Sequence, residues 1–229
     1  MRSKSVLRSS AGRTLKEAAK RRAAPRALPR EAKPASRVWF TSDTHFGHAK
    51  ILVVVQRPFR TVDEMDEALV GNWNAVVAPG DDVWHLGDFA FQEAGSLEGL
   101  RGRLNGKIHL IRGNHDVGVA ERQRHLFASV HDIAEIEIDG QMLALCHYPL
   151  REWPKAWRGG WHLFGHVHGA LDGEPHGHSL DAGVDSHDFA PVDISRIAQL
   201  MDGRRSPFTP EKDRRIVPRG AALRQRRSK

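Results

Sequence analysis

The sequence is poor in cysteine, in tyrosine and in long apolar runs. Its one cysteine, Cys146, excludes an internal disulfide and favours a reducing compartment, which we take to be the cytoplasm. Its longest apolar runs reach only five residues, as at 51–55, far short of the roughly 18 that a membrane-spanning helix needs. We therefore expect no membrane contact. Histidine, by contrast, occurs 14 times, which favours imidazole and carboxylate metal ligands over thiolates.

The net charge of +7 is distributed unevenly. Residues 1–36 carry 11 Lys or Arg against 2 acidic residues, and residues 203–229 carry 10 against 2. The centre, 37–202, carries 14 against 24. We therefore expect an acidic domain between two basic, disordered tails that could contact nucleic acid through its phosphates. The first tail lacks the apolar core of a secretion signal, but its Arg- and Ser-rich composition leaves organellar targeting open.

Hydrophobic periodicity predicts alternating strands and helices in the centre. Strands are expected at 38–42, 82–86, 107–112, 130–138, 141–146, 161–164 and 179–184. Helices are expected at 62–77, 97–104, 121–127 and 195–201, and a hairpin turn at Asp139-Gly140. The first half is typical of parallel strand–helix–strand units and the second half of a hairpin-rich sheet. Two packed sheets flanked by helices would accommodate both halves.

Short polar clusters follow the predicted strands. In chain order they are Asp43-Thr44-His45, Gly87-Asp88, Gly113-Asn114-His115-Asp116, Cys146-His147 and Gly165-His166-Val167-His168. The first and last clusters each hold two candidate ligands at positions i and i+2, which project to the same side at a strand end. Parallel strand ends share one edge of a sheet, so the clusters can converge there. Each cluster alone is typical of a turn or a cap, but their joint order indicates a metal site.

In this order the motifs resemble those of the calcineurin-like metallophosphoesterase superfamily, and especially a small bacterial and phage subgroup without a cap domain. Supporting stretches are Trp39-Phe40-Thr41-Ser42-Asp43, Arg57-Pro58-Phe59, Asn72-Trp73-Asn74, Leu86-Gly87-Asp88-Phe89, His147-Tyr148-Pro149-Leu150 and Gly183-Val184-Asp185. The likeness covers roughly 38–200 and neither tail. It implies an α/β fold, a four-layer α/β/β/α sandwich of two mixed sheets flanked by helices.

The resemblance also implies a dinuclear metal site. By motif position, one metal would be bound by Asp43, His45 and His168, the other by Asn114, His147 and His166, and Asp88 would bridge the two. Nitrogen and oxygen donors without a thiolate suit divalent transition metals. We expect manganese, with iron, zinc or nickel as alternatives.

The implied reaction is phosphoester hydrolysis, in which a metal-bridging hydroxide attacks phosphorus in line with the leaving oxygen. His115 would contact the phosphate and protonate the leaving group. Asp116 would either orient His115 or cap the following helix. His48 is a candidate for substrate or ligand contact, and Arg57 would either bind phosphate or form a surface salt bridge.

The expected substrate is a phosphodiester, such as a nucleotide, because a short segment between the second and third motifs leaves little room for a cap. A phosphomonoesterase and a nuclease or nucleic-acid-end-binding protein guided by the basic tails are alternatives. A non-catalytic metal-binding scaffold is a further alternative, which the complete motif set disfavours. The stretch 87–93 lacks the Asp-Arg pair typical of Ser/Thr protein phosphatases and dinucleoside tetraphosphate hydrolases.

Overall fold

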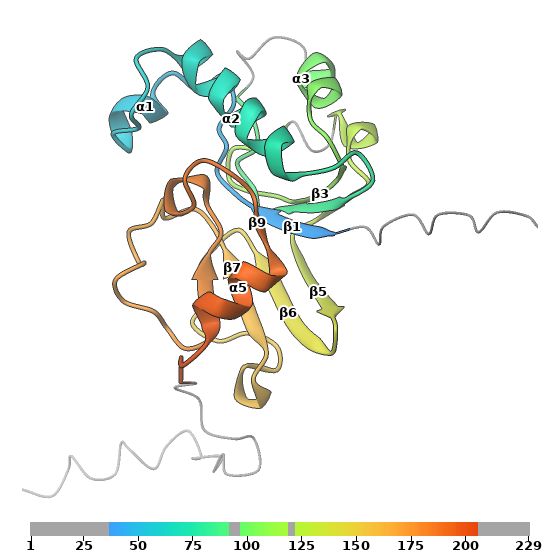
Figure 1. Cartoon of the computed structure of the whole chain (residues 1–229), viewed down its shortest axis with the longest axis vertical. Helices are drawn as coiled ribbons and strands as arrows, with labels where there is room; N and C mark the ends of the chain where they lie inside the picture. The colour runs from blue at the N-terminus through green and yellow to red at the C-terminus, as the bar shows by residue number, and fades with distance from the viewer. Residues whose placement is uncertain (1–36, 92–96, 119–121, 206–229) are drawn as a thin grey trace, which may run out of the picture. The chain divides into compact units, whose positions relative to one another are not determined.

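The computed structural model describes residues 37–91, 97–118 and 122–205 (Figure 1). The two expected basic tails lie outside these ranges except for 203–205, so their disorder and their contact with nucleic acid stay predictions. Among the described residues, no helix is long and apolar enough to cross a membrane.

The first sheet has five strands in the order β4-β3-β2-β1-β9. They are β1 (Val38–Thr41), β2 (Asp82–His85), β3 (Lys107–Ile111), β4 (Ser129–His131) and β9 (Val192–Asp193). Strands β1 to β4 run parallel, and β9 pairs antiparallel with β1. The carboxyl ends of β1, β2 and β3 therefore lie along one edge, and three of the polar motifs begin there.

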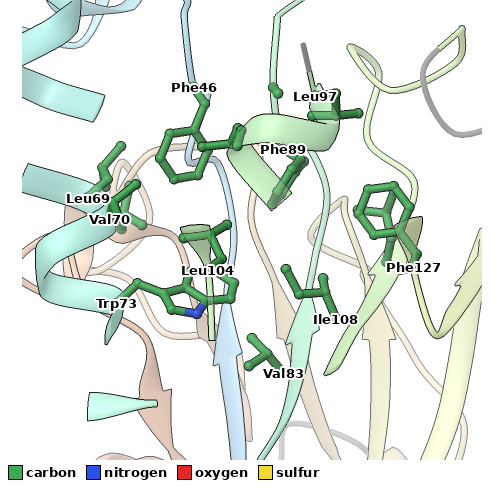
Figure 2. Close-up of a cluster of buried hydrophobic side chains, with 14 of the residues drawn as sticks. Phe46, Leu69, Val70, Trp73, Val83, Phe89, Leu97, Leu104, Ile108 and Phe127 are labelled. Atoms are coloured by element: carbon green, nitrogen blue, oxygen red, sulfur yellow. The ribbon is translucent and has the colours of Figure 1, made fainter. Parts of the chain in front are cut away.

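Three helices cover one face of this sheet: α1 (Ile51–Val54), α2 (Val62–Val76) and α3 (Leu97–Arg103) (Figure 1). The side chain of Thr61 caps α2 by accepting a hydrogen bond from the Glu64 amide. Side chains four residues apart on α2, among them Leu69 and Trp73, form one buried stripe. Figure 2 shows this stripe packed toward Val83 of β2. The helix predicted at 62–77 is thus confirmed, whereas α1 was not predicted.

The second sheet has the order β5-β6-β7-β8. Its strands are β5 (Ile133–Ile138), β6 (Gln141–Cys146), β7 (Trp161–Phe164) and β8 (Ser179–Asp181). The hairpin turn is confirmed, because β5 and β6 pair antiparallel around Asp139 and Gly140, both with positive φ. The remaining pairs are parallel, so the expectation of a hairpin-rich sheet was wrong. As a result, β6 and β7 also end at a common edge.

An apolar cluster fills the space between the two sheets. It combines Phe40, Leu86 and Ile111 from the first sheet with Leu143, Leu145 and Leu163 from the second. Helix α5 (Ile194–Met201) adds Ile197 and Met201 to the same cluster. On the opposite face of the second sheet, Trp153 and Ala156 pack against Ala144. The prediction of two mixed sheets flanked by helices is therefore confirmed, and Cys146 is buried.

One predicted strand, 130–138, is two strands in the structure. His131 ends β4 in the first sheet, and Ile133 begins β5 in the second, so the chain changes sheets at Asp132. Val130 and the later Ala134, Ile136 and Ile138 share one period-2 phase, which Asp132 interrupts. Periodicity does not show that the residues before and after Asp132 join different sheets.

Two other predicted elements are shorter in the structure. Of the helix expected at 121–127, Glu121 lies outside the described residues, and Arg124–Leu126 form a 3-10 helix (η1). The strand expected at 179–184 ends at Asp181 and is followed by a second 3-10 helix, Val184–Ser186 (η3).

Candidate metal centre

Two groups of potential metal ligands lie where strands of both sheets end. One group is Asp43, His45 and His168, and the other is Asp88, His147 and His166. Within each group, the ligand atoms all lie within 4.8 Å of one another. Asn114, the remaining expected ligand, places its Oδ1 3.0 Å from the Nε2 atom of His147. The structure therefore brings together all seven residues that the motifs singled out.

Asp88 belongs to the second group and also adjoins the first. Its Oδ2 atom is 3.5 Å from Nε2 of His45, in the first group, and 3.6 Å from Nε2 of His147, in the second. The same His45 nitrogen is 3.9 Å from Oδ1 of Asp43. One carboxylate oxygen flanked by an imidazole of each group is the arrangement expected of a shared ligand.

Two buried polar atoms of the first group are unpaired. Within the described ranges, Asp43 Oδ1 and His45 Nε2 are buried and have no hydrogen-bond partner. Leaving such an atom unsatisfied costs about 1–3 kcal/mol, so unpaired buried groups are rare. A cation bound between them would satisfy both, and their oxygen and nitrogen donors suit a divalent transition metal. The residues therefore fit the ion that the motifs imply.

Burial also changes the pKa values in this group. It raises the pKa of Asp43 to about 7, although the charge of His168 and hydrogen bonds oppose the shift. Burial, assisted by the positive charges of neighbouring histidines and Arg57, lowers the pKa of His45 to about 2. Burial alone would lower the pKa of His168, but its hydrogen bond to Asp185 and the charge of Asp43 raise it. A bound cation would favour the carboxylate form of Asp43 and keep His45 neutral.

Five of the seven expected ligands have left-handed backbone conformations. They are Asp43, His45, Asp88, His166 and His168, with φ between +49° and +73°. For residues other than glycine this conformation costs roughly 1–2 kcal/mol each. Strained residues concentrate at functional sites, where the surrounding structure holds them in place. Here the sharp turns at the strand ends direct the side chains into the centre.

Glycines next to two expected ligands allow another ligand's carboxylate to approach the backbone. A Cβ atom at Gly113 would lie 2.2 Å from Oδ1 of Asp88, and one at Gly165 would lie 2.2 Å from Oδ2 of Asp43. Without a Cβ there, the amide of His115 donates to Asp88 at 2.9 Å, and the amide of His166 donates to Asp43 at 2.8 Å. Each of these motifs is therefore packed on the carboxylate of another motif.

Replacing Gly165 with alanine should disturb the centre through this close packing. The new methyl group would also lie 2.0 Å from Oγ of Ser42, so we expect a loss of about 1–3 kcal/mol in the free energy of unfolding. Manganese should bind more weakly because Asp43 must move. Denaturant unfolding and a manganese titration measure both effects. Gly173→Ala is the matched control, since no atom lies within 4 Å of its Cβ. Wild-type stability and affinity in Gly165→Ala would contradict the packing.

Asp116 makes hydrogen bonds other than those that its two predicted roles require. It is completely buried, and its Oδ2 atom accepts hydrogen bonds from the amides of Asp88, at 2.7 Å, and Gly113, at 2.8 Å. Its Oδ1 atom accepts from the amide of Phe89 at 3.0 Å. Both carboxylate oxygens thus accept hydrogen bonds from backbone amides. Asp116 therefore connects the motif that contains Asp88 to its own motif and does not orient the His115 ring. That ring is partly exposed, with Nε2 4.0 Å from Oδ2 of Asp88.

Arg57 lies in the interior, only 5 % exposed, and not on a surface available to phosphate. Its Nε and Nη2 atoms donate to the two carboxylate oxygens of Asp185, both at 2.8 Å. The guanidinium also donates to the backbone oxygens of Asp43, at 2.6 Å, and Thr44, at 3.1 Å. The predicted salt bridge is present, but it is buried and not at the surface, and the buried guanidinium does not match the alternative of phosphate binding. Arg57 instead connects the first motif to Asp185.

Asp185 is the residue that motif reasoning missed. Its Oδ2 atom lies 2.7 Å from Nδ1 of His168, so that nitrogen donates to the carboxylate and Nε2 faces the centre. Such carboxylate partners orient metal-binding histidines and make them more basic. The stretch Gly183-Val184-Asp185 contributed to the family resemblance, but its sequence alone indicated no contact with His168.

His48 lies beside the centre, as predicted. Its Nδ1 atom is 3.3 Å from Nδ1 of His45, and its ring stacks on Phe91 with centroids 4.3 Å apart. The ring of His115 is 5.7 Å from that of His48. These rings form one side of the entrance to the centre.

Comparison with known proteins gives matches over most of the chain. The family model described as the calcineurin-like phosphoesterase superfamily domain matches residues 36–179. An uncharacterized protein of Methanocaldococcus jannaschii is 34 % identical over 173 residues, covering 72 % of this chain and 92 % of the relative. The gene 66 protein of Mycobacterium phage D29 is 31 % identical over 191 residues, covering 70 % and 94 %.

Among solved structures, a protein of unknown function from Aquifex aeolicus is 25 % identical, with a TM-score of 0.60. The match covers 72 % of this chain and 99 % of that one. The family model and the structural match each cover more than half of the chain.

Proposed function

The chain belongs to the calcineurin-like phosphoesterase superfamily, and from this premise we propose that it hydrolyses phosphodiesters at a dinuclear metal centre. The observation that carries the proposal is the position of Asp88. It belongs to one ligand triplet, and its Oδ2 atom lies within 3.6 Å of an imidazole nitrogen of each triplet. Two adjacent sites that share a carboxylate are suited to holding two ions over one phosphate.

The proposed ligand assignment follows the two groups. Asp43, His45 and His168 bind one ion, and His147, His166 and Asn114 bind the other. Asp88 is shared. When bound, two divalent ions, for which we propose manganese, lower the pKa of a water molecule and neutralise charge on the phosphate.

The protein's own groups position the substrate and move protons. His115 is the proposed general acid, because its ring is partly exposed at the entrance while its amide is held by Asp88. A protonated Nε2 atom there would donate its proton to the leaving oxygen. Asp116 keeps the loops that carry Asp88 and His115 together through its three backbone hydrogen bonds.

Exposure at the entrance supports a diester over a monoester. Asn114, His115 and His166 are all exposed, although they border a buried set of ligands. An entrance bordered by exposed side chains leaves room for organic groups on both sides of a phosphate. We therefore propose diesters as the preferred substrates, with nucleotides among them.

Hydrolysis of bis(4-nitrophenyl) phosphate and of 4-nitrophenyl phosphate by the manganese-loaded chain tests the proposal. We expect kcat/KM for the diester to exceed that for the monoester by roughly 10-fold or more, and His115→Asn to lower kcat by about 10²–10⁴-fold. His125→Asn, at an exposed histidine paired with Glu98, should retain full activity. A preference for the monoester would assign the chain to monoesterases, and no hydrolysis of either compound would overturn the proposal.

A further inference from the structure

Tyr148 is the one tyrosine of the chain and directly follows the proposed ligand His147. Its ring centroid lies 4.9 Å from that of His147 and 4.7 Å from that of His166, edge to face in both cases. The residue is nevertheless 44 % exposed. It thus places a partly exposed aromatic ring beside two proposed ligands of one metal.

A cavity of about 260 Å³ has Pro149, the residue that follows Tyr148, in its wall. Its wall includes Pro149, two residues after His147, and Phe164, two residues before His166. Two residues of extended chain span at most about 7 Å, so the Cα atoms of Pro149 and Phe164 lie within roughly that distance of the Cα atoms of His147 and His166. The cavity and the metal centre are therefore close enough to bind parts of one small molecule.

The lining is apolar with a polar margin. Leu150, Phe164 and Leu171 contribute hydrophobic surface, and arginine and acidic side chains both occur around them. Asp181, the most buried acid of the lining, already accepts hydrogen bonds from the amides of Gly169 and Gly183. Mixed charge does not favour a second phosphate. The volume is below the roughly 300–1,000 Å³ of pockets for drug-sized ligands, which suits a single ring system.

The position of the proposed acid indicates which ester group would reach this cavity. The His115 ring contacts those of His45, His48 and Phe91, whereas Tyr148 contacts those of His147 and His166. The leaving group should lie on the side of His115, which protonates it. The group next to Tyr148 is then the one that stays on the phosphate.

We infer that Tyr148 and the adjoining cavity bind a planar ring, a nucleobase or an aryl group, on the ester group that the phosphate retains. The inference rests on the proposed phosphodiesterase function and specifies its substrates. Stacking on the Tyr148 ring and burial against Leu150 and Leu171 supply the binding energy. A retained methyl group would gain neither interaction.

Three diesters with one leaving group test the inference on the full, manganese-loaded chain. They are the methyl, phenyl and thymidine 5′ esters of 4-nitrophenyl phosphate. In the wild type, kcat/KM for the phenyl and thymidine esters should exceed that for the methyl ester by about 10-fold, mainly through KM. Tyr148→Ala and Leu171→Ser should bring this ratio to about one. Tyr148→Phe keeps the ring and should keep the ratio.

Val53→Ala, at an exposed apolar residue of α1, is the matched control and should leave the ratio unchanged. If kcat/KM exceeds that of the methyl ester for both ring esters, the subsite accepts any planar ring. If it does so for the thymidine ester alone, the subsite is specific for a nucleoside. A wild-type ratio near one, or the wild-type ratio in Tyr148→Ala, would overturn the inference.

If the wild type hydrolyses none of these esters, the proposed function fails, and equilibrium binding decides the subsite separately. Phenyl phosphate should then bind about 10-fold more tightly than methyl phosphate to the wild type. It should show no such preference for Tyr148→Ala, and equal binding of the two compounds to the wild type would reject the subsite.

Discussion

Replacing Asp88 with asparagine should lower kcat for diester hydrolysis by at least about 10³-fold. Oδ2 of Asp88 lies 3.5 Å from Nε2 of His45, in one ligand group, and 3.6 Å from Nε2 of His147, in the other. A neutral amide cannot stabilise two adjacent cations as a carboxylate does. Losing several kcal/mol of transition-state stabilisation corresponds to a loss of this size. The amide oxygen can still accept from the His115 backbone, so the fold should persist.

Metal content identifies the cause of the lost activity. The purified wild type should contain close to two manganese ions per chain, and Asp88→Asn one or fewer, by elemental mass spectrometry. Asp132→Asn is the matched control, because its side chain is 74 % exposed and is not one of the proposed ligands. Two bound ions and an unchanged rate in Asp88→Asn would refute the shared-ligand role.

Replacing Asp185 with asparagine should weaken manganese binding about 10- to 100-fold. The carboxylate lies 2.7 Å from Nδ1 of His168 and holds that ring with its other nitrogen toward Asp43. An amide would supply neither the charge nor a fixed acceptor. A manganese titration checks this expectation, with Glu137→Gln, an exposed residue of β5, as the control. Wild-type affinity in Asp185→Asn would exclude the role.

Arg57→Lys separates the two roles of Asp185. Lysine removes the two-pronged contact with Asp185 but leaves the carboxylate on His168. We therefore expect it to lower the free energy of unfolding more than it lowers manganese affinity. If the free energy of unfolding and the manganese affinity of Arg57→Lys both fall as far as in Asp185→Asn, the carboxylate affects the metal only by stabilising the fold.

The strands of the site could be predicted from the sequence because the residues that indicate a strand and its end are neighbours in the chain. Apolar runs followed by Asp, Asn or His indicate strand ends, and the i, i+2 spacing in 43–45 and 166–168 indicates a shared side. The pairing partners of the later strands are not local. This explains why the change of sheet at Asp132 and the parallel pairing of β7 were missed.

The supporting residues were harder to predict for the same reason. Arg57 looks like a surface cation in the sequence, and it is buried only because Asp185, 128 positions later, neutralises it. Asp116 looks like a helix cap, which also accepts backbone amides. It accepts them instead from a loop 28 positions earlier. In both cases the residue type indicated the chemistry correctly, and only the fold shows the partner.

The left-handed backbone at five expected ligands has a consequence for engineering this chain. Glycine at those positions would relieve roughly 1–2 kcal/mol each, so substitutions selected for thermostability alone would favour removing the ligands. Proteins commonly keep such locally unfavourable residues where activity requires them. A stabilised variant should therefore be sought in positions such as the exposed valines of α1, with the strand ends left unchanged.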